Sequence, residues 1–480
     1  MPKDVVATTP RDARDAVARA PRPRPPRPRQ PRRRPPRSAA GTRVVWLIGP
    51  ALVAGVAYLD PGNVASNMTA GARYGYLLVW VVVLANVMAW LIQYLSAKLG
   101  IVTGESLPQV LGRRIRRRPA RIAYWLQAEL VAMATDLAEV IGGAVALNLL
   151  FGTPLVVGGL ITGLVSLVLL AVHSRRGPRT FEFIIMGLVV IIAIGFSLGV
   201  VIAPPEPGSV LGGLVPRFED SGSVLLAASI LGATIMPHAI YAHSALSRDR
   251  FGDADAARER ADADSALPNP RGAVETSTAP VMNDSAATVA DTANGRLSTR
   301  RLLHATRWDV SIAMAIAGTV NLCILLLAAA NLSGIAGTDS LEGAYAAIGA
   351  SLGPAVATLF AVGLLASGLA STSVGAYAGA EIMSGLLHAR IPLLTRRLVT
   401  LIPALIVLAL GFDPTLALVL SQVVLSFGIP FALIPLVILT ARSSVLGRWR
   451  NHWATTAAGV AASVFLVTLN GVLLWLVFTA

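Results

Sequence analysis

The sequence predicts an all-α polytopic membrane protein with eleven transmembrane helices, and three observations support this fold class. The chain has 480 residues, of which 54% are hydrophobic and only 14% charged, and its mean hydropathy is +0.66. Apolar segments recur along it that approach or exceed the roughly 20 residues a helix needs to cross a bilayer. The connections between them alternate between arginine-rich and arginine-poor. This composition excludes a soluble enzyme with a conventional core.

Residues 1–42 are rich in proline and arginine and contain too few apolar residues to fold, so we expect a disordered cytosolic tail. The segment lacks the apolar core and cleavage site of a signal peptide. The single cysteine, Cys323, lies in an apolar segment. An intramolecular disulfide is therefore excluded, and thiolate metal chemistry is not expected.

The first predicted span covers residues 44–72, and the other ten lie at 76–99, 122–150, 154–173, 181–203, 222–246, 308–333, 354–386, 398–412, 415–440 and 453–479. If the amino terminus is cytosolic, the outer connections hold essentially Arg73 and Arg217. The inner connections then hold Arg113, Arg114, Arg116, Arg117, Arg118, Arg175, Arg176, Arg179, Arg396, Arg397, Arg442, Arg448 and Arg450. This asymmetry agrees with the positive-inside rule and places the carboxy terminus outside. It explains the net charge of +14 without any nucleic-acid partner.

The first span contains the motif Asp60-Pro61-Gly62-Asn63. The apolar segment before Asp60 is too short to cross a bilayer, so we expect the carboxylate to lie within the membrane. A charge there costs at least about 2.5–3.5 kcal/mol, which favours a functional role. Pro61 removes a backbone donor and Gly62 adds conformational freedom, so a broken helix is predicted at this depth.

The sixth span contains Met236-Pro237-His238, and its only ionisable side chains are His238 and His243. Pro61 follows Trp46 by fifteen residues and Pro237 follows Gly222 by fifteen, so both breaks are expected at similar depth. Interrupted helices in matching positions indicate a transporter site at the interface of two repeats. Two inverted five-helix units plus one extra helix account for eleven spans.

The predicted domains follow from this arrangement. Spans one to six occupy residues 43–247, and spans seven to eleven occupy residues 301–480. Between them, residues 248–300 are rich in Asp, Ala, Arg, Ser and Thr and show no helical or strand period through their middle. We expect a mostly disordered cytosolic insertion there.

The two breaks offer a mixed set of metal ligands. Asp60 supplies an anionic oxygen and Asn63 an amide oxygen, while unwound carbonyls near Ala57 and Ala233 add further oxygens. The thioether of Met236 favours transition metals over Mg²⁺ or Ca²⁺, although methionine is also a common packing residue. In the tenth span, Gln422 is a further amide that suits a coordination shell.

The third span carries Glu129, Asp136 and Glu139, whose spacing places them on one helix face. They either relay protons or form a structural network with the arginines at the start of the ninth span, Arg396 and Arg397. For at least one arginine, extension to the membrane interface is the simpler expectation. The two histidines of the sixth span are metal ligands, proton carriers or buried histidines bonded to carbonyls.

These motifs together, with Ser421-Gln422, resemble the natural resistance-associated macrophage protein (Nramp) family over residues 43–247 and 300–479. The resemblance implies a LeuT-like fold and symport of Mn²⁺ or Fe²⁺ with protons into the cytosol, with no cofactor. It implies metal ligation by Asp60, Asn63, Met236, the carbonyls of Ala57 and Ala233 and the amide of Gln422. It implies proton movement through His238, Glu129, Asp136, Glu139 and, on the exit path, Arg397.

Two other functions stay open from the sequence. In a Na⁺-coupled amino acid or organic-solute symporter of the same fold, Asp60 would meet an amine, although an aromatic content of 6% does not favour a large aromatic pocket. In a non-transporting metal sensor, residues 248–300 would signal to a partner. No nucleophile, phosphate loop or cofactor motif indicates an enzyme. The Ala/Arg-rich composition suggests a bacterial plasma membrane, and we expect a monomer in the lipid bilayer.

Overall fold

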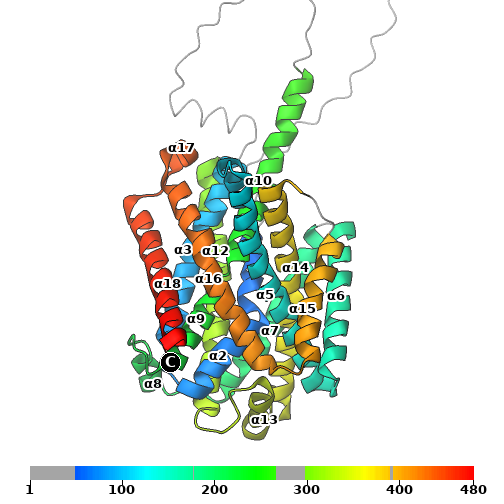
Figure 1. Cartoon of the computed structure of the whole chain (residues 1–480), viewed down its shortest axis with the longest axis vertical. Coiled ribbons are helices and arrows are strands. Elements are labelled where there is room, and N and C mark those ends of the chain that lie inside the picture. Colours follow the sequence, from blue (N-terminus) through cyan, green and yellow to red (C-terminus); the bar gives the residue numbers. More distant parts are fainter. Residues whose placement is uncertain (1–48, 177, 266–297, 390–392, 480) are drawn as a thin grey trace, which may run out of the picture. The chain divides into compact units, whose positions relative to one another are not determined.

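The structure is a computed structural model that describes residues 49–176, 178–265, 298–389 and 393–479. Within these ranges all regular secondary structure is helical (Figure 1). The predicted tail at residues 1–42 and most of the predicted insertion, residues 266–297, lie outside the described residues.

The elements follow one another along the chain as short and long helices. They are α1 (Pro50–Gly55), η2 (Val56–Leu59), α2 (Pro61–Tyr74), α3 (Val79–Thr103), α4 (Leu107–Arg114), α5 (Arg118–Phe151), α6 (Leu155–Arg176), α7 (Pro178–Ile202), α8 (Pro207–Gly212), α9 (Ser221–Thr234), α10 (Pro237–Ser265), α12 (Thr299–Asn331), α13 (Leu341–Leu352), α14 (Pro354–Leu387), α15 (Leu393–Ala409), α16 (Pro414–Ala441), α17 (Ser443–Leu446), η3 (Gly447–Trp449) and α18 (Trp453–Thr479).

Every predicted span overlaps at least one of these helices. Among the described residues, seven helices are long and apolar enough to cross a membrane, if the continuous segment Ser221–Phe251 is counted as one. Three shorter apolar helices lie at Pro50–Leu59, Leu155–Leu169 and Met186–Ile202. The helical membrane fold is therefore confirmed, while the count of eleven spans stays a prediction.

Two helix boundaries differ from the sequence-based expectation. α10 continues to Ser265, through the first third of the segment predicted as an insertion, and α15 begins at Leu393 rather than near residue 398. Residues 248–265 contain five Ala and four Arg residues, which favour a helix by intrinsic propensity. Because they have no apolar face, hydrophobic periodicity could not reveal this extension.

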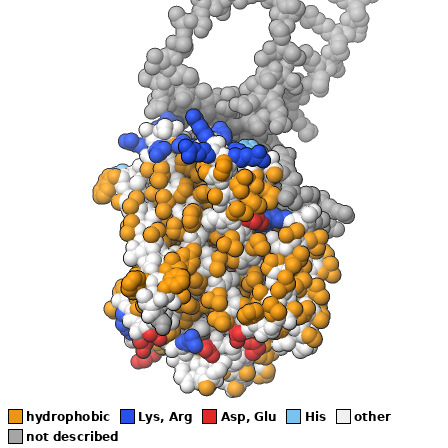
Figure 2. All heavy atoms as spheres, in the orientation of Figure 1, with side chains coloured by type: hydrophobic (Ala, Val, Ile, Leu, Met, Phe, Trp, Pro, Cys, Tyr) orange, Lys and Arg blue, Asp and Glu red, His pale blue; other side chains and the backbone are white. Residues whose placement is uncertain are grey.

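The packing brings the two interrupted helices together. α2 packs against both α9 and α12, α10 packs against α3, and α16 contacts both α9 and α2. α5 lies against α14, α15 and α16. As Figure 1 shows, α17 lies at one end of the bundle, with α8 and α13 at the other. Lys and Arg side chains gather at the α17 end in the view of Figure 2.

Candidate functional site

The first predicted break is present at Asp60. α1 narrows into the 3₁₀ turn η2, and the chain then becomes extended at Asp60, with φ −71° and ψ 162°. Asp60 Oδ1 accepts a hydrogen bond from the Asn63 backbone N–H at 2.8 Å, so its carboxylate caps the first turn of α2. Pro61 occupies the first helical position, where its missing donor costs nothing.

Gly62 has a different role from the one expected. It lies within the first turn of α2, so it does not supply an unusual backbone conformation. A Cβ atom at this position would lie 1.7 Å from the Gln422 Nε2 atom of α16. At Gly232 in α9, a Cβ atom would lie 1.9 Å from the Gln422 carbonyl oxygen. Both glycines therefore allow α16 to approach the two interrupted helices closely.

The second predicted break lies between α9 and α10. α9 ends at Thr234, Ile235 has φ −113° and ψ 55°, and α10 starts at Pro237. Met236 lies in the break and its side chain is fully buried. The chain therefore has two interrupted helices, as the sequence predicted.

Hydrogen bonds connect the two breaks. Asn63 Nδ2 donates to the Tyr58 carbonyl at 2.6 Å and, more weakly, to the Ala233 carbonyl at 3.4 Å. One turn away, Ser66 Oγ and Ser229 Oγ lie 2.6 Å apart and join α2 to α9. The predicted carbonyl of Ala233 and the amide of Asn63 are thus neighbours.

Gln422 completes this cluster from α16. Its Nε2 donates to Asp60 Oδ2 at 3.1 Å, and its Oε1 is buried without a hydrogen-bond partner. Asp60, Asn63 and Gln422 are each fully buried. The structure therefore brings these three predicted side chains together. Ala57 and Met236 lie on the same two breaks and are equally buried, and their contribution as ligands stays a prediction.

The partners of Asp60 are all neutral. Its carboxylate accepts from a backbone N–H and from an amide, and no ion pair within the described residues includes it. Nor do those residues contain a group of three His, Cys, Asp or Glu side chains arranged to hold a metal. A cation at this site would therefore depend on one carboxylate together with amide, carbonyl and thioether donors.

Several polar groups that the motifs do not reveal support the breaks. Asn67 Nδ2 donates to Asn63 Oδ1 at 2.6 Å, and Asn321 Nδ2 of α12 donates to the Tyr58 carbonyl at 3.0 Å. Ser367 of α14 donates to the Leu59 carbonyl. Asn67 could be predicted from the sequence, because it follows Asn63 by one helical turn. Asn321 and Ser367 lie in distant segments of the chain, and no motif there connects them to the breaks.

A second polar region, which we call the charge cluster, consists of Glu129, Asp136, Glu139, Arg396 and Arg397. Arg397 Nη1 lies 2.6 Å from Asp136 Oδ1 and 3.2 Å from Glu139 Oε2. Its Nε donates to Ser166 Oγ at 3.0 Å. Arg397 is only 1% exposed although it is among the largest side chains of the protein.

Both arginine side chains are buried, whereas the sequence favours an extended, interfacial position for at least one of them. Arg396 is 6% exposed and its Nη2 donates to Glu129 Oε1 at 2.9 Å. Both arginines lie in the early turns of α15, which starts upstream of the predicted span. The helix therefore carries them inward, where each one pairs with an acidic side chain of α5.

The charge cluster lies close to the first break. A Cβ atom at Gly142 of α5 would lie 2.0 Å from Pro61 Cβ, and Gly142 follows Glu139 by three residues. One oxygen of each acid in the cluster is buried without a hydrogen-bond partner. These oxygens are Glu129 Oε2, Asp136 Oδ2 and Glu139 Oε1.

The two histidines are both buried in α10 but have different neighbours. His238 Nδ1 lies 3.2 Å from Thr135 Oγ1, next to Asp136 in sequence. His243 Nδ1 lies 2.6 Å from Gln93 Oε1, and the Gln93 amide contacts the Tyr58 hydroxyl. His238 thus faces α5, which carries the acids, whereas His243 faces α3.

A family model described as natural resistance-associated macrophage protein-like matches residues 51–476. The chain belongs to the Nramp family. The match includes both breaks of the Nramp chain and its charge cluster, and it agrees with the resemblance in the sequence motifs.

Several relatives of this Nramp chain are named as transporters rather than enzymes. The divalent metal cation transporter MntH of Mycobacterium tuberculosis is 56% identical over 434 residues, covering 90% of this chain and 92% of that protein. MntH of Deinococcus radiodurans is 43% identical over 90% of each chain. A crystal structure of the Eremococcus coleocola manganese transporter superposes with a TM-score of 0.72 at 30% identity, covering 90% of this chain and 87% of that one.

Proposed function

We propose that this chain is a secondary transporter that carries divalent transition-metal ions, Mn²⁺ or Fe²⁺, together with protons across the cell membrane. The observation that carries the proposal is the Asp60 carboxylate, which is fully buried and has only neutral partners. A buried charge without a counter-ion is costly, so the site favours a cation from outside the protein. The names of the relatives support a metal as that cation.

The donor set favours a transition metal. Asp60, the Asn63 amide, the carbonyls of Ala57 and Ala233 and the unpartnered Gln422 Oε1 offer oxygen ligands. Met236 would add a thioether, which contributes little to Mg²⁺ or Ca²⁺ but suits softer first-row metals. The carboxyl end of α1–η2 also points its negative dipole at Asp60.

Alternating access would move the metal between the two sides. The metal sheds water to the ligands in both breaks, and the interrupted helices then swing to open the site inward. At the breaks themselves the direct contact from Asn63 to Ala233 is long, at 3.4 Å, whereas the short contact between Ser66 and Ser229 joins α2 to α9 one turn away. The short bonds of Asn63 to Tyr58 and Asn67 stay within one interrupted helix.

The charge cluster would carry the coupled proton. It contains three acids, Glu129, Asp136 and Glu139, and two arginines, so with all groups ionised its net charge is −1. One proton would balance this charge. The approach of Gly142 to Pro61 brings Glu139 within one helical turn of the first break. A proton therefore has a short route from Asp60 towards the cluster, with His238 beside α5.

We further propose that the protein acts as a monomer in a bacterial plasma membrane, with a cytosolic amino terminus and an external carboxy terminus. The basic end of the bundle would face the cytosol under the positive-inside rule (Figure 2). Helix α1 begins beside Arg250 of α10, and Figure 1 marks the carboxyl end opposite α17. An odd number of membrane crossings would place the two ends of the chain on opposite sides of the membrane.

The test is Mn²⁺ uptake into proteoliposomes that contain the purified full-length chain and a trapped pH dye. We expect Mn²⁺ entry with internal acidification, and we expect a large excess of external Ca²⁺ to leave uptake intact. Uptake of metal without acidification would remove proton coupling from the proposal. If no Mn²⁺ or Fe²⁺ enters, the metal-transport proposal fails.

A further inference from the structure

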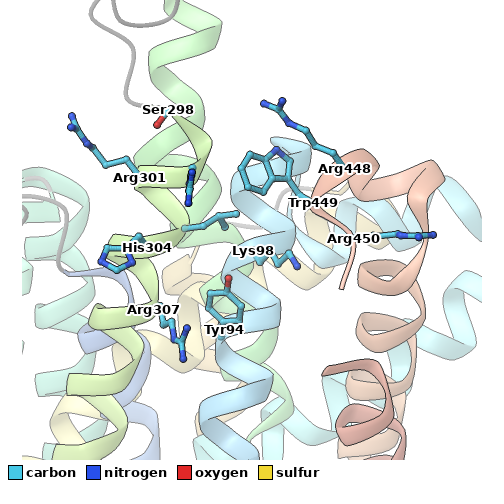
Figure 3. Close-up of a pocket in the computed structure, with 11 residues that line it drawn as sticks. Tyr94, Lys98, Ser298, Arg301, His304, Arg307, Arg448, Trp449 and Arg450 are labelled. Carbon is cyan, nitrogen blue, oxygen red and sulfur yellow. The ribbon is translucent and has the colours of Figure 1, made fainter. Parts of the chain in front are cut away.

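The basic end of the bundle contains a cavity, separate from the metal site, with a volume of about 580 Å³. Its lining comes from α3, from α12 and the residue before it, and from the segment 448–450 (Figure 3). Its six cationic side chains are Lys98, Arg300, Arg301, Arg307, Arg448 and Arg450. Within the part of the chain that the structure describes, no acidic side chain lines it. We call it the basic cavity.

One of these cations, Lys98, is almost fully buried in the wall of the basic cavity. Lys98 is 7% exposed, and its Nζ donates to Asn451 Oδ1 at 2.9 Å. Asn451 is itself held by Thr440, whose hydroxyl accepts from Asn451 Nδ2 at 2.8 Å. A lysine this buried usually has an acidic partner. Here its polar partner is a neutral amide, so the cavity favours an anion.

A second, apolar cavity of about 1270 Å³ adjoins the first, and the two share Arg448 and Arg450. Along α18 it is lined by Val460, Ala461, Val464 and Phe465. Val460 and Val464 are 49% and 59% exposed, so the residues that the structure describes leave this face of α18 largely uncovered. We call it the apolar groove.

We propose that this chain binds one anionic phospholipid at its basic end, with the headgroup phosphate in the basic cavity and the acyl chains in the apolar groove. Arginine and lysine bind phosphate through charge-assisted hydrogen bonds. Basic pockets between transmembrane helices are a known form of anionic-headgroup site. The shared arginines mark the point where the phosphate meets the acyl chains.

The apolar groove identifies a lipid rather than a soluble phosphate compound. A free phosphate would use only the basic cavity and would gain nothing from the α18 side chains. A phospholipid would occupy both cavities. Its phosphate is joined to its acyl chains, as the basic cavity is joined to the apolar groove at Arg448 and Arg450. Trp449, which lines the basic cavity under the Arg448 guanidinium at 5.1 Å, suits the interfacial depth.

The experiment uses the purified, delipidated full-length chain in detergent and native mass spectrometry. Phosphatidylglycerol is titrated against phosphatidylcholine with the same acyl chains. We expect one phosphatidylglycerol to be retained at concentrations at which phosphatidylcholine is not. Equal retention of the two lipids would overturn the proposal.

Two pairs of variants locate the site. The double change Arg300→Gln and Arg450→Gln should weaken phosphatidylglycerol binding by roughly 10- to 30-fold, since each basic residue contributes to anionic-lipid affinity. The control pair, Arg116→Gln and Arg442→Gln, removes the same charge from exposed positions outside both cavities and should change affinity less than about twofold. Equal losses in the two pairs would indicate nonspecific attraction and overturn the proposal.

A third variant distinguishes lipid from free phosphate. Ala461→Trp would fill the apolar groove, so it should weaken phosphatidylglycerol binding while glycerol phosphate, a headgroup without chains, is unaffected. If Ala461→Trp leaves lipid binding unchanged and inorganic phosphate displaces the lipid, the cavity is a site for soluble phosphate. The thermal midpoint of the native chain should also rise with phosphatidylglycerol, and that of the Arg300/Arg450 variant should not.

Discussion

The first break and the charge cluster both contain buried carboxylates, but the partners of these carboxylates differ: neutral groups at the break and arginines in the charge cluster. At the break, one carboxylate is held by a backbone N–H and an amide. In the charge cluster, Asp136 and Glu139 are held by Arg397, and Glu129 is held by Arg396. Less than one helical turn of α5 separates Glu139 from the residue that contacts Pro61.

This difference separates a region that pairs its acids with its own arginines from one that does not. The charge cluster contains its own cations, and we propose that it takes up the coupled proton. Among the described residues the break pairs its carboxylate with no cation, and we propose that an external metal ion supplies one. A buried carboxylate without a cation is costly, so structural stability alone does not account for Asp60.

The largest expected effect comes from neutralising the break. Asp60→Asn keeps the shape of the side chain and an acceptor for the Asn63 N–H, but removes the charge. Mn²⁺ binding should fall by at least about 100-fold, since changes to outer-shell partners alone cost 10- to 100-fold. Isothermal calorimetric titration of the purified chain with Mn²⁺ measures this affinity. Asp339→Asn, an exposed acid paired with Arg73, is the control. Unchanged Mn²⁺ affinity in Asp60→Asn would eliminate the break as the metal site.

Removing the internal cation should damage stability instead. Arg397→Gln leaves Asp136 and Glu139 buried without their arginine and should cost about 3–5 kcal/mol of the free energy of unfolding. In Arg73→Gln, the partner pair is 54% and 43% exposed, so the loss should be at most about 1 kcal/mol. Denaturant titration in detergent compares them. Equal losses would show that the charge cluster is not the internally balanced region described above.

A smaller effect is expected from Gly62→Ala, which tests the approach of α16. The new methyl group would overlap Gln422 Nε2 and displace that amide from Asp60. We expect Mn²⁺ affinity to fall by at least about tenfold, because the displaced amide would neither hold Asp60 nor offer its Oε1 atom to the metal. Adding Gln422→Ala to this variant should change little more, since both act through one contact. In α18, Gly471→Ala has no atom nearby and serves as control. Additive losses would argue against the proposed contact.

Met236→Ala is expected to change Mn²⁺ affinity least of these variants. It should instead change the selectivity for Mn²⁺ over Ca²⁺ or Mg²⁺. Loss of the thioether should let Ca²⁺ or Mg²⁺ compete better with Mn²⁺, because the remaining donors are oxygens. Competition uptake assays measure this. Met314→Ala removes another buried methionine outside the breaks and should lower stability without altering selectivity. A Met236→Ala variant with native selectivity would reduce this methionine to a packing residue.

The sequence predicted both breaks, because each is marked by a proline within an apolar segment, and the first also by an acid. These marks are local and can be recognised without knowing which helices pack against them. It also predicted that the third span carries its acids on one face. What the sequence could not supply is which arginine each acid meets. Arg397 and Asp136 are 261 residues apart in the chain, and their contact depends on how α15 packs against α5.

The glycines show a second limit of sequence reasoning. The sequence predicts backbone freedom at Gly62, whereas the structural role of this glycine is to leave space for Gln422. Glycine next to proline has several physical explanations, and only the neighbouring atoms distinguish them. The polar extension of α10 to Ser265 shows the same limit for secondary structure, because a helix without an apolar face has no hydrophobic period.

The most direct test of this division of roles is simultaneous measurement of Mn²⁺ uptake and internal acidification in proteoliposomes containing Glu139→Gln. This variant keeps Asp136 beside Arg397 and leaves the proposed metal ligands untouched. If the break takes the metal and the charge cluster takes the proton, Mn²⁺ entry should persist while the acidification per Mn²⁺ ion falls. A variant in which metal and proton uptake fall together in a constant ratio would contradict the account.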